Sequence, residues 1–342
     1  LQEVLHETSD IRPERPESLG TVRFFPDVGT AVFRSGWTPE DFLFVFRSGP
    51  FFNHQHLDQG SFAFVDHGEV FLEERYDGEH HYYDDPVYRS HAIQPISHNT
   101  ILLNRNPQSQ KVGDPKGFAP GMNDQARLLH WLDAPDLAFV AGSLEKVYVD
   151  EVRQLKRNVV FLKPRSILLI DEIVPARAPI EVNRLFHTRW KKDICPGDWE
   201  SRITKGSKVL RLVHLAPETA VKEILREPHF LYQYAARPLI ERGYLQISDR
   251  TEKEKLIFAD LLSAAPEGSP SPYEIEKHKE SVSIRRKMGE RTQTVVLNLG
   301  SSISLGDWSS DALILASSSR GEIFLARGTT LSLEGGIKLH SD

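Results

Sequence analysis

Cysteine is almost absent from this chain of 342 residues: Cys195 is the only one, so no disulfide bond can form within the chain. A lone cysteine is more often small apolar filler than a nucleophile, and we expect Cys195 to be buried. No run of 18 apolar residues occurs, so the sequence predicts no membrane span. The net charge of −6 gives no indication of a nucleic-acid-binding surface.

Helical patterns are also rare, whereas apolar segments of strand length recur between turn residues. The first predicted strands are 21–25, 29–34, 42–47, 61–65 and 69–72. Tight hairpins are predicted at 66–68 and 163–165, and only 217–226 has the pattern of a short helix. The predicted fold is therefore all-β: a large antiparallel β-sandwich with a small C-terminal β domain.

Turn-rich stretches divide the chain into three parts. Residues 1–18 read like the end of a helix followed by a Pro-rich linker, so we expect a further domain upstream. Residues 19–263 are assigned to the sandwich. A Pro/Ser-rich stretch begins at residue 264, and residues 264–342 are expected to form the C-terminal β domain or an extra layer of the sandwich.

Histidines are concentrated in one seventh of the chain. Of the 14 histidines, seven lie between residues 53 and 99. The stretch His54-Gln-His56-Leu-Asp58 is the most informative, because alternate residues of a strand share a face. Two imidazoles on one face, joined by a carboxylate and a further imidazole, suit a zinc ion. A solvated polar strand is the simpler interpretation of an isolated His-x-His pair.

An ordered series of motifs favours the metal site. After His54-Gln-His56-Leu-Asp58 come Ser61-Phe62, a glycine hairpin, Phe71-Leu-Glu-Glu74, a Tyr-rich segment and Ser97-His98-Asn99-Thr100. In this order the motifs resemble those of the heparinase II/III-like polysaccharide lyases, over about 50 residues.

The resemblance implies a zinc ion of structural rather than Lewis-acid character, because an eliminating enzyme needs no activated water. Its ligands would be His56 and His98, together with an acidic residue that follows the hairpin. Glu74 aligns with that acidic position, and Glu73 and Asp77 are the alternatives. This part of the sequence departs from the Leu-x-Asp-Pro-Gly type stretch that is usual in the family.

The resemblance also implies that His54 faces the substrate as a catalytic residue. Elimination at a uronic acid removes the proton at C5, and histidine can take that proton or support the substrate carboxylate. The alternative is that His54 lies behind the metal ligands or in the wall of the cleft and does not act on the substrate. Tyr83, Tyr88 and Arg89 are expected to bind substrate, against the alternatives of sheet-packing tyrosines and an exposed salt bridge.

The implied partners are an anionic polysaccharide and an upstream α/α toroid domain that supplies further catalytic groups. The chain alone is therefore expected to be inactive, and the family implies a periplasmic or secreted bacterial enzyme. The alternatives are a non-catalytic carbohydrate-binding or structural β-sandwich and a cupin-like metal oxygenase. Ser-His-Asp chemistry has no local support, since no Gly-x-Ser-x-Gly occurs.

Overall fold

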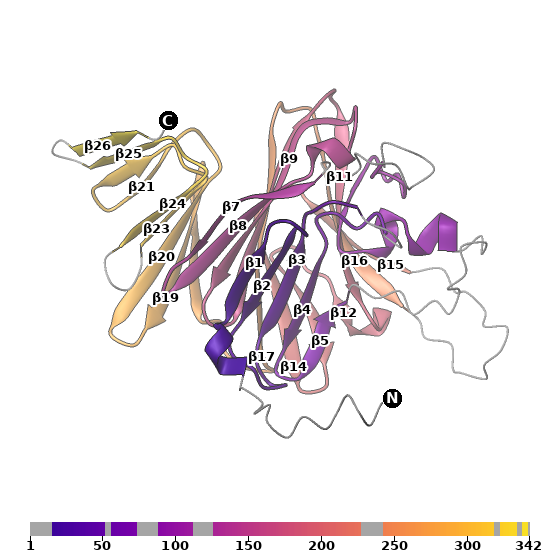
Figure 1. Cartoon of the computed structure of the whole chain (residues 1–342), viewed down its shortest axis with the longest axis horizontal. Helices are drawn as coiled ribbons and strands as arrows, with labels where there is room; N and C mark the ends of the chain where they lie inside the picture. Colours follow the sequence, from indigo (N-terminus) through magenta and orange to yellow (C-terminus); the bar gives the residue numbers. More distant parts are fainter. Residues whose placement is uncertain are drawn as a thin grey trace, which may run out of the picture.

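The computed structural model is built almost entirely of antiparallel β-sheet, and the prediction of an all-β sandwich is confirmed (Figure 1). It describes residues 16–51, 56–73, 88–111, 126–226, 242–317, 322–333 and 337–340. The described helices are single turns: Pro16–Leu19, Tyr88–Ala92, Pro95–Ser97, Glu145–Val147 and Lys191–Asp193. None of them has the length and apolarity that crossing a membrane requires.

The first sheet is a five-stranded meander whose strands pair in sequence order. Its strands are β1 (Val22–Phe25), β2 (Thr30–Arg34), β3 (Leu43–Arg47), β4 (Phe62–Asp66) and β5 (Glu69–Leu72). Alternate residues of β2, β3 and β4 are buried, which is the pattern of a sheet with one face in a core. The predicted hairpin between β4 and β5 is present, and its turn places His67 and Gly68 at φ values of 53° and 76°.

The central sheet has eight strands in the order β12-β13-β14-β17-β10-β9-β8-β7. These are β7 (Arg127–Asp133), β8 (Leu137–Ser143), β9 (Val152–Leu162), β10 (Ser166–Pro175), β12 (Ile194–Cys195), β13 (Glu200–Lys205), β14 (Lys208–Ala216) and β17 (Leu256–Pro266). In β10, Leu169 packs in the core on one face of the sheet and Leu168 in the core on the other. The near-continuous apolar sequence of β10 follows from this double burial.

A four-stranded sheet, β15-β16-β11-β6, shares the core of the first sheet. Its strands are β6 (Ile101–Leu103), β11 (Ile180–Thr188), β15 (Val221–Arg226) and β16 (Gly243–Thr251). The predicted helix at 217–226 is wrong, because β15 pairs with β16 from Val221 to Arg226. Hydrogen bonds to a distant strand outweigh the local helical pattern there.

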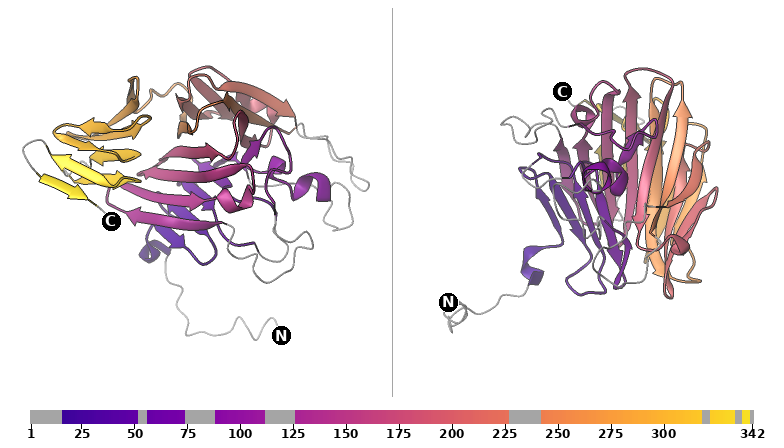
Figure 2. Two further views of the ribbon diagram at one scale, coloured as in Figure 1. Left: turned by 90° about the horizontal axis from the view of Figure 1, so that it is seen from above. Right: turned by 90° about the vertical axis from the view of Figure 1, so that its right-hand side faces the viewer.

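The C-terminal strands form a further layer on the other face of the central sheet (Figures 1 and 2). One sheet contains β18 (Tyr273–Lys277), β19 (Ser281–Met288), β20 (Arg291–Asn298), β23 (Ile314–Ser317) and β24 (Ile323–Ala326). The other contains β21 (Ile303–Leu305), β22 (Trp308–Ser310), β25 (Thr330–Leu333) and β26 (Ile337–His340). Val282 and Ile284 pack with Leu168 and Ile170 of the central sheet. The division at residue 264 lies inside β17 and stays a prediction.

Cys195 lies on β12, at the edge of the central sheet, and its side chain is exposed. The expectation that Cys195 is buried is wrong. An edge position gives the thiol no apolar neighbour on its open side, which the residue type alone does not reveal.

A group of phenylalanines joins the first sheet to the central one. Phe161 of β9 stacks on Phe42 with 5.1 Å between ring centroids and contacts Phe33 at 5.6 Å. Phe33, Phe42 and Phe161 are fully buried, so their packing holds the two layers that carry the motif segments.

We predict that Phe161→Ala lowers the free energy of unfolding by about 3–5 kcal/mol, because it leaves a cavity between the two sheets. Phe25→Ala is the matched control, since Phe25 lies on the first sheet and is 48% exposed. The control is expected to change stability by no more than about 0.5 kcal/mol. Urea unfolding of both variants tests the prediction, and equal effects would contradict it.

Candidate functional site

His56 and His98 meet although 42 residues separate them in the sequence. His56 precedes β4 in a non-strand segment, and His98 follows the short helix Pro95–Ser97. The Nδ1 atom of His56 lies 3.2 Å from the Nε2 atom of His98, and the ring centroids are 5.1 Å apart. His98 is buried and His56 is half-buried. The structure therefore brings two of the predicted zinc ligands together.

The nitrogen separation fits a shared zinc ion. Two ligand nitrogens at tetrahedral positions around zinc, each about 2.0–2.1 Å from it, stand roughly 3.3–3.4 Å apart. Burial and the neighbouring His98 lower the pKa of His56 to about 4, although Asp58 acts in the opposite direction. His56 is therefore neutral near pH 7, which is the form that binds a metal. A hydrogen bond between the two rings gives the same distance without a metal.

Asp58 does not join the histidines. Its Oδ1 atom accepts a hydrogen bond from Nε of Arg47 at 3.2 Å, and the nearby Gln59 side chain donates to the same oxygen. Residues 56–58 are not in a strand, so the expectation that alternate residues share a strand face fails here. A main-chain hydrogen bond from Leu57 to Ile93 fixes this segment instead.

The third predicted ligand is not placed. Within the ranges given above, no group of three His, Cys, Asp or Glu side chains is arranged to hold a metal ion, so Glu73 does not complete one with the two histidines. Glu74 and Asp77 lie outside the described residues. The backbone of Glu73 is held at both of its polar groups: its N–H donates to the carbonyl of His187, and its carbonyl accepts from Asn99.

Four residues are predicted to face the substrate: His54, Tyr83, Tyr88 and Arg89. His54 and Tyr83 lie outside the described residues. Tyr88 and Arg89 begin the short helix Tyr88–Ala92. The structure describes their backbone and not their side chains. Their roles stay predictions.

Asn99 connects the segments around the histidine pair. Its side-chain amide donates to the carbonyls of Phe62 at 2.7 Å and Glu73 at 3.1 Å. Its Oδ1 atom accepts from the backbone N–H of His187 at 2.6 Å. Asn99 is fully buried, so these contacts replace water completely. The sequence motif pointed to His98, whereas the structural role of its neighbour Asn99 was missed.

His187 and Tyr244 add an aromatic pair beside Asn99. His187 lies near the end of β11, and its ring stacks on Tyr244 of β16 with 4.6 Å between centroids and 29° between planes. The two residues face each other in the strand register. A histidine at the end of an apolar strand was the available sequence signal for this pair.

Basic residues follow directly after β11. The register places Thr188, Gly243 and Arg226 side by side on three strands, so β11, β15 and β16 all reach the same sheet end. From there Arg189 and Lys192 both contact the ring of Trp190, with their charged groups 5.9 Å and 5.6 Å from its centroid.

Both cations of this group are exposed, and the part of the chain that the structure describes gives neither of them a carboxylate partner. The nearby Asp193 is already paired with Lys205 at 2.9 Å. We call Arg189, Trp190 and Lys192 the basic rim. Exposed cations over an aromatic face can contact the charge and the ring of an anionic sugar at once.

Ser201, His214 and Asp260 have the spacing of a hydrolase triad that local sequence did not indicate. Ser201 Oγ lies 2.8 Å from His214 Nε2, and His214 Nδ1 lies 2.6 Å from Asp260 Oδ1. These residues are 0%, 4% and 1% exposed. A nucleophile must reach its substrate, so this buried trio is part of the core rather than a hydrolytic site.

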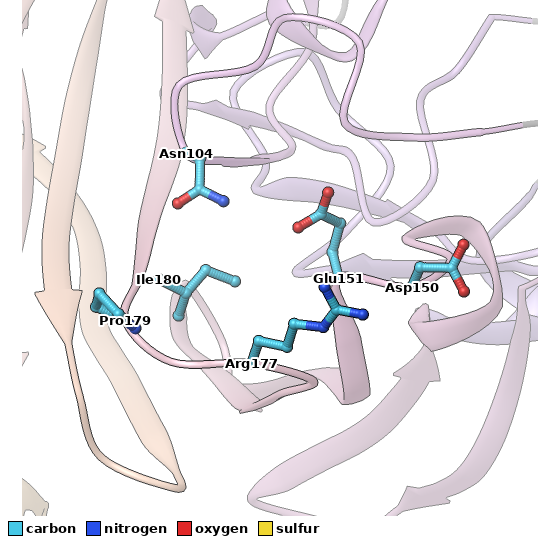
Figure 3. A pocket seen from close by; sticks show the side chains of 6 residues that line it. All are labelled: Asn104, Asp150, Glu151, Arg177, Pro179 and Ile180. Carbon is cyan, nitrogen blue, oxygen red and sulfur yellow. The ribbon is translucent and has the colours of Figure 1, made fainter.

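A separate cavity of about 230 Å³ is shown in Figure 3. Its lining residues are Asn104, Asp150, Glu151, Arg177, Pro179 and Ile180. Ile180 begins β11, whereas His187 lies near its other end, about 23 Å away at the usual rise of a strand. The cavity is therefore separate from the histidine pair.

Comparison with known proteins supports the motif assignment. The family model described as "Heparinase II/III-like, C-terminal" matches residues 18–191, just over half of the chain. A search of curated proteins gave no match.

Several solved structures share the fold. The heparan sulfate lyase HepC from Pedobacter heparinus is similar with a TM-score of 0.64 and 16% identity, over 82% of this chain and 43% of that protein. One heparinase III structure has a TM-score of 0.61 and 17% identity over 82% and 42% of the two chains. Another has a TM-score of 0.59 and 16% identity over 81% and 42%.

The chain thus spans less than half the length of these structures, and at such low identity the likeness concerns the fold alone. The match of the family model is the more specific finding, because it contains both His56 and His98. The chain belongs to the heparinase II/III-like family, whose C-terminal region it carries.

Proposed function

We propose that this chain is the β-sandwich part of a lyase that cleaves a uronic-acid-containing polysaccharide by β-elimination. The observation that carries the proposal is the 3.2 Å approach of His56 to His98, two motif residues from separate segments, inside the region that matches the family model. The structures similar in fold include heparan sulfate lyase and heparinase III, and this likeness favours a polysaccharide lyase as the class of enzyme.

Zinc is proposed as a structural ion held by His56, His98 and Glu74. When bound, it supplies a fixed positive centre that orients these side chains, and no water activation is required of it. Glu74 is supported as the third ligand because Asn99, the neighbour of His98, holds the backbone of Glu73 by a hydrogen bond. Asp77 is the alternative at this position.

His54 is proposed as the catalytic residue of this chain, since it lies two residues before His56. In the reaction a base removes the proton at C5, the electron pair forms the C4–C5 double bond, the C4–O4 bond breaks, and O4 is protonated. His54 either takes the C5 proton as neutral imidazole or supports the carboxylate as imidazolium. Tyr83, Tyr88 and Arg89 are proposed to contact the sugar.

The substrate is proposed to be anionic because the basic rim begins two residues after His187, which is bonded to Asn99, the neighbour of His98. Thr188 is the neighbour of both His187, whose N–H binds Asn99, and Arg189 of the rim. A chain of uronates or sulfated sugars can thus reach cations and the reacting site together. The missing acid and base groups are proposed to come from an upstream α/α toroid, and the enzyme to act in the periplasm or outside the cell.

We predict that the chain binds one zinc ion and that His56→Ala and His98→Ala each abolish the binding. Zinc at a thousandfold excess over its dissociation constant stabilises a folded protein by about 4 kcal/mol, so thermal unfolding with zinc and with EDTA measures the effect. His278→Ala, in an exposed turn after β18, is the control and is expected to keep the full response. If zinc stabilised His56→Ala and His98→Ala as much as the wild type, the proposed zinc site would be refuted.

We predict that Arg189→Ala with Lys192→Ala weakens binding to an anionic polysaccharide roughly fivefold, because two exposed ionic contacts are worth about 1 kcal/mol together. The effect should shrink as salt rises. Arg250→Ala with Lys253→Ala is the matched control: these exposed cations lie at the opposite end of β16. Titrations against an anionic and a neutral polysaccharide test the prediction, and equal losses in both double variants would contradict it.

We predict that the isolated chain does not cleave uronans, whereas the protein extended by its upstream region forms unsaturated uronyl products that absorb in the ultraviolet. In the extended protein, His54→Ala is expected to lower kcat about 10²- to 10⁴-fold, as loss of a general acid or base does. His278→Ala is again the control.

Full activity of His54→Ala would remove His54 from the mechanism. An extended protein that binds uronans without forming unsaturated products would favour a non-catalytic carbohydrate-binding sandwich. Rapid turnover by the isolated chain would show that no upstream group is needed.

A further inference from the structure

Arg157 is buried inside the sandwich, with 1% of its surface exposed, and all three nitrogen atoms of its guanidinium group donate hydrogen bonds. Its Nε and Nη2 atoms donate to the two carboxylate oxygens of Asp171 at 2.7 Å and 2.9 Å, across the β9–β10 pairing. Its Nη1 atom donates to two main-chain carbonyls, those of Gly60 at 2.6 Å and Asn99 at 3.0 Å. A planar group with five donors is required for this pattern.

The two carbonyls belong to the segments that carry the histidine pair. Asn99 directly follows His98, and Gly60 lies in the segment that leads from His56 to β4. Neither residue lies in a strand, and main-chain hydrogen bonds tie the two segments to different sheets: Gly60 donates to Arg47 of β3, and Thr100 accepts from Leu185 of β11. The Asn99 side chain also links the segments, by donating to the Phe62 carbonyl. The Nη1 atom of Arg157 joins them, and Asp171 holds the guanidinium group through its other two nitrogens, Nε and Nη2.

A lysine at position 157 cannot make these four hydrogen bonds. Its ammonium group is a single point with three donors, so it cannot pair with both carboxylate oxygens and also bridge two carbonyls. A buried carbonyl that loses its hydrogen-bond partner destabilises the segment that carries it. The segments of Gly60 and Asn99 would then shift toward other donors and carry His56 and His98 apart.

We infer that Arg157 is a positioning residue of the histidine pair: its hydrogen bonds to Gly60 and Asn99 set the distance between His56 and His98 and thereby the affinity for zinc. The inference rests on the proposed zinc site and deepens it. Partners behind metal ligands are typically worth 10- to 100-fold in metal affinity, about 1.4–2.7 kcal/mol.

Arg184 provides a matched comparison in the same cluster. It is fully buried, and its Nε atom donates to Oδ2 of Asp171 at 2.6 Å. Its Nη1 atom is paired with Asp260. None of its described hydrogen bonds reaches the segments of His56 or His98. Replacing Arg184 therefore perturbs the same buried charges and the stability of the core without removing the bridge between the two segments.

The experiment compares Arg157→Lys and Arg157→Gln with Arg184→Lys in the full chain. Urea unfolding first establishes which variants are folded. Zinc affinity is then measured by competition with a chromophoric chelator, and Co²⁺ replaces zinc so that its absorption spectrum reports the ligand geometry. The lysine variant keeps the charge that balances Asp171 and the glutamine variant keeps two amide donors, so the test is read in whichever of the two remains folded.

We expect the Arg157 variants to bind zinc 10- to 100-fold more weakly than the wild type and to show a changed Co²⁺ spectrum. Arg184→Lys should lose stability while keeping the zinc affinity and the spectrum. Equal zinc affinity in the Arg157 variants and the wild type, or equal losses in the Arg157 and Arg184 variants, would overturn the inference alone. A wild-type chain that binds no zinc would overturn the proposed metal site and, with it, the inference.

Discussion

Two arginines and two aspartates buried between the facing sheets impose the main constraint on this structure. Arg184 of β11 crosses to Asp171 of β10 and Asp260 of β17, and Arg157 pairs with Asp171. Burial alone would raise the pKa of Asp171, but the two guanidinium groups outweigh it and hold that pKa below its ordinary value. Removing one member leaves an uncompensated charge, typically at a cost of about 3–5 kcal/mol, so the sheets are held in one relative position.

The same cluster determines the geometry of the histidine pair. Asp171 fixes Arg157, Arg157 bonds the carbonyl of Asn99, and the Asn99 side chain binds Phe62, Glu73 and His187. Irregular segments carry polar backbone groups that a sheet does not satisfy, and the core supplies their partners here. The site is therefore an extension of the buried polar core, which explains how two loop segments can hold imidazoles in a defined arrangement.

The sequence predicted the strands well because apolar and polar residues alternate along a strand that has one buried face. It failed at 217–226, since β15 depends on pairing with β16 and no local pattern records a distant partner. His56 and His98 could be found from their motifs. Arg157 could not, because its partner Asn99 lies 58 residues earlier and an arginine in a strand is usually exposed.

The net charge of the chain differs in sign from the local charge of the basic rim. The chain as a whole has a net charge of −6, an average that says nothing about the charge at one end of a sheet. Charges are screened over about 8 Å at physiological ionic strength, so acidic residues at the far end of β11, about 23 Å away, do not cancel the field of Arg189 and Lys192. An acidic protein can therefore present a cationic surface to an acidic polymer. The hydrogen bond from His187 to Asn99 links the strand that leads into this surface to the residue that follows His98.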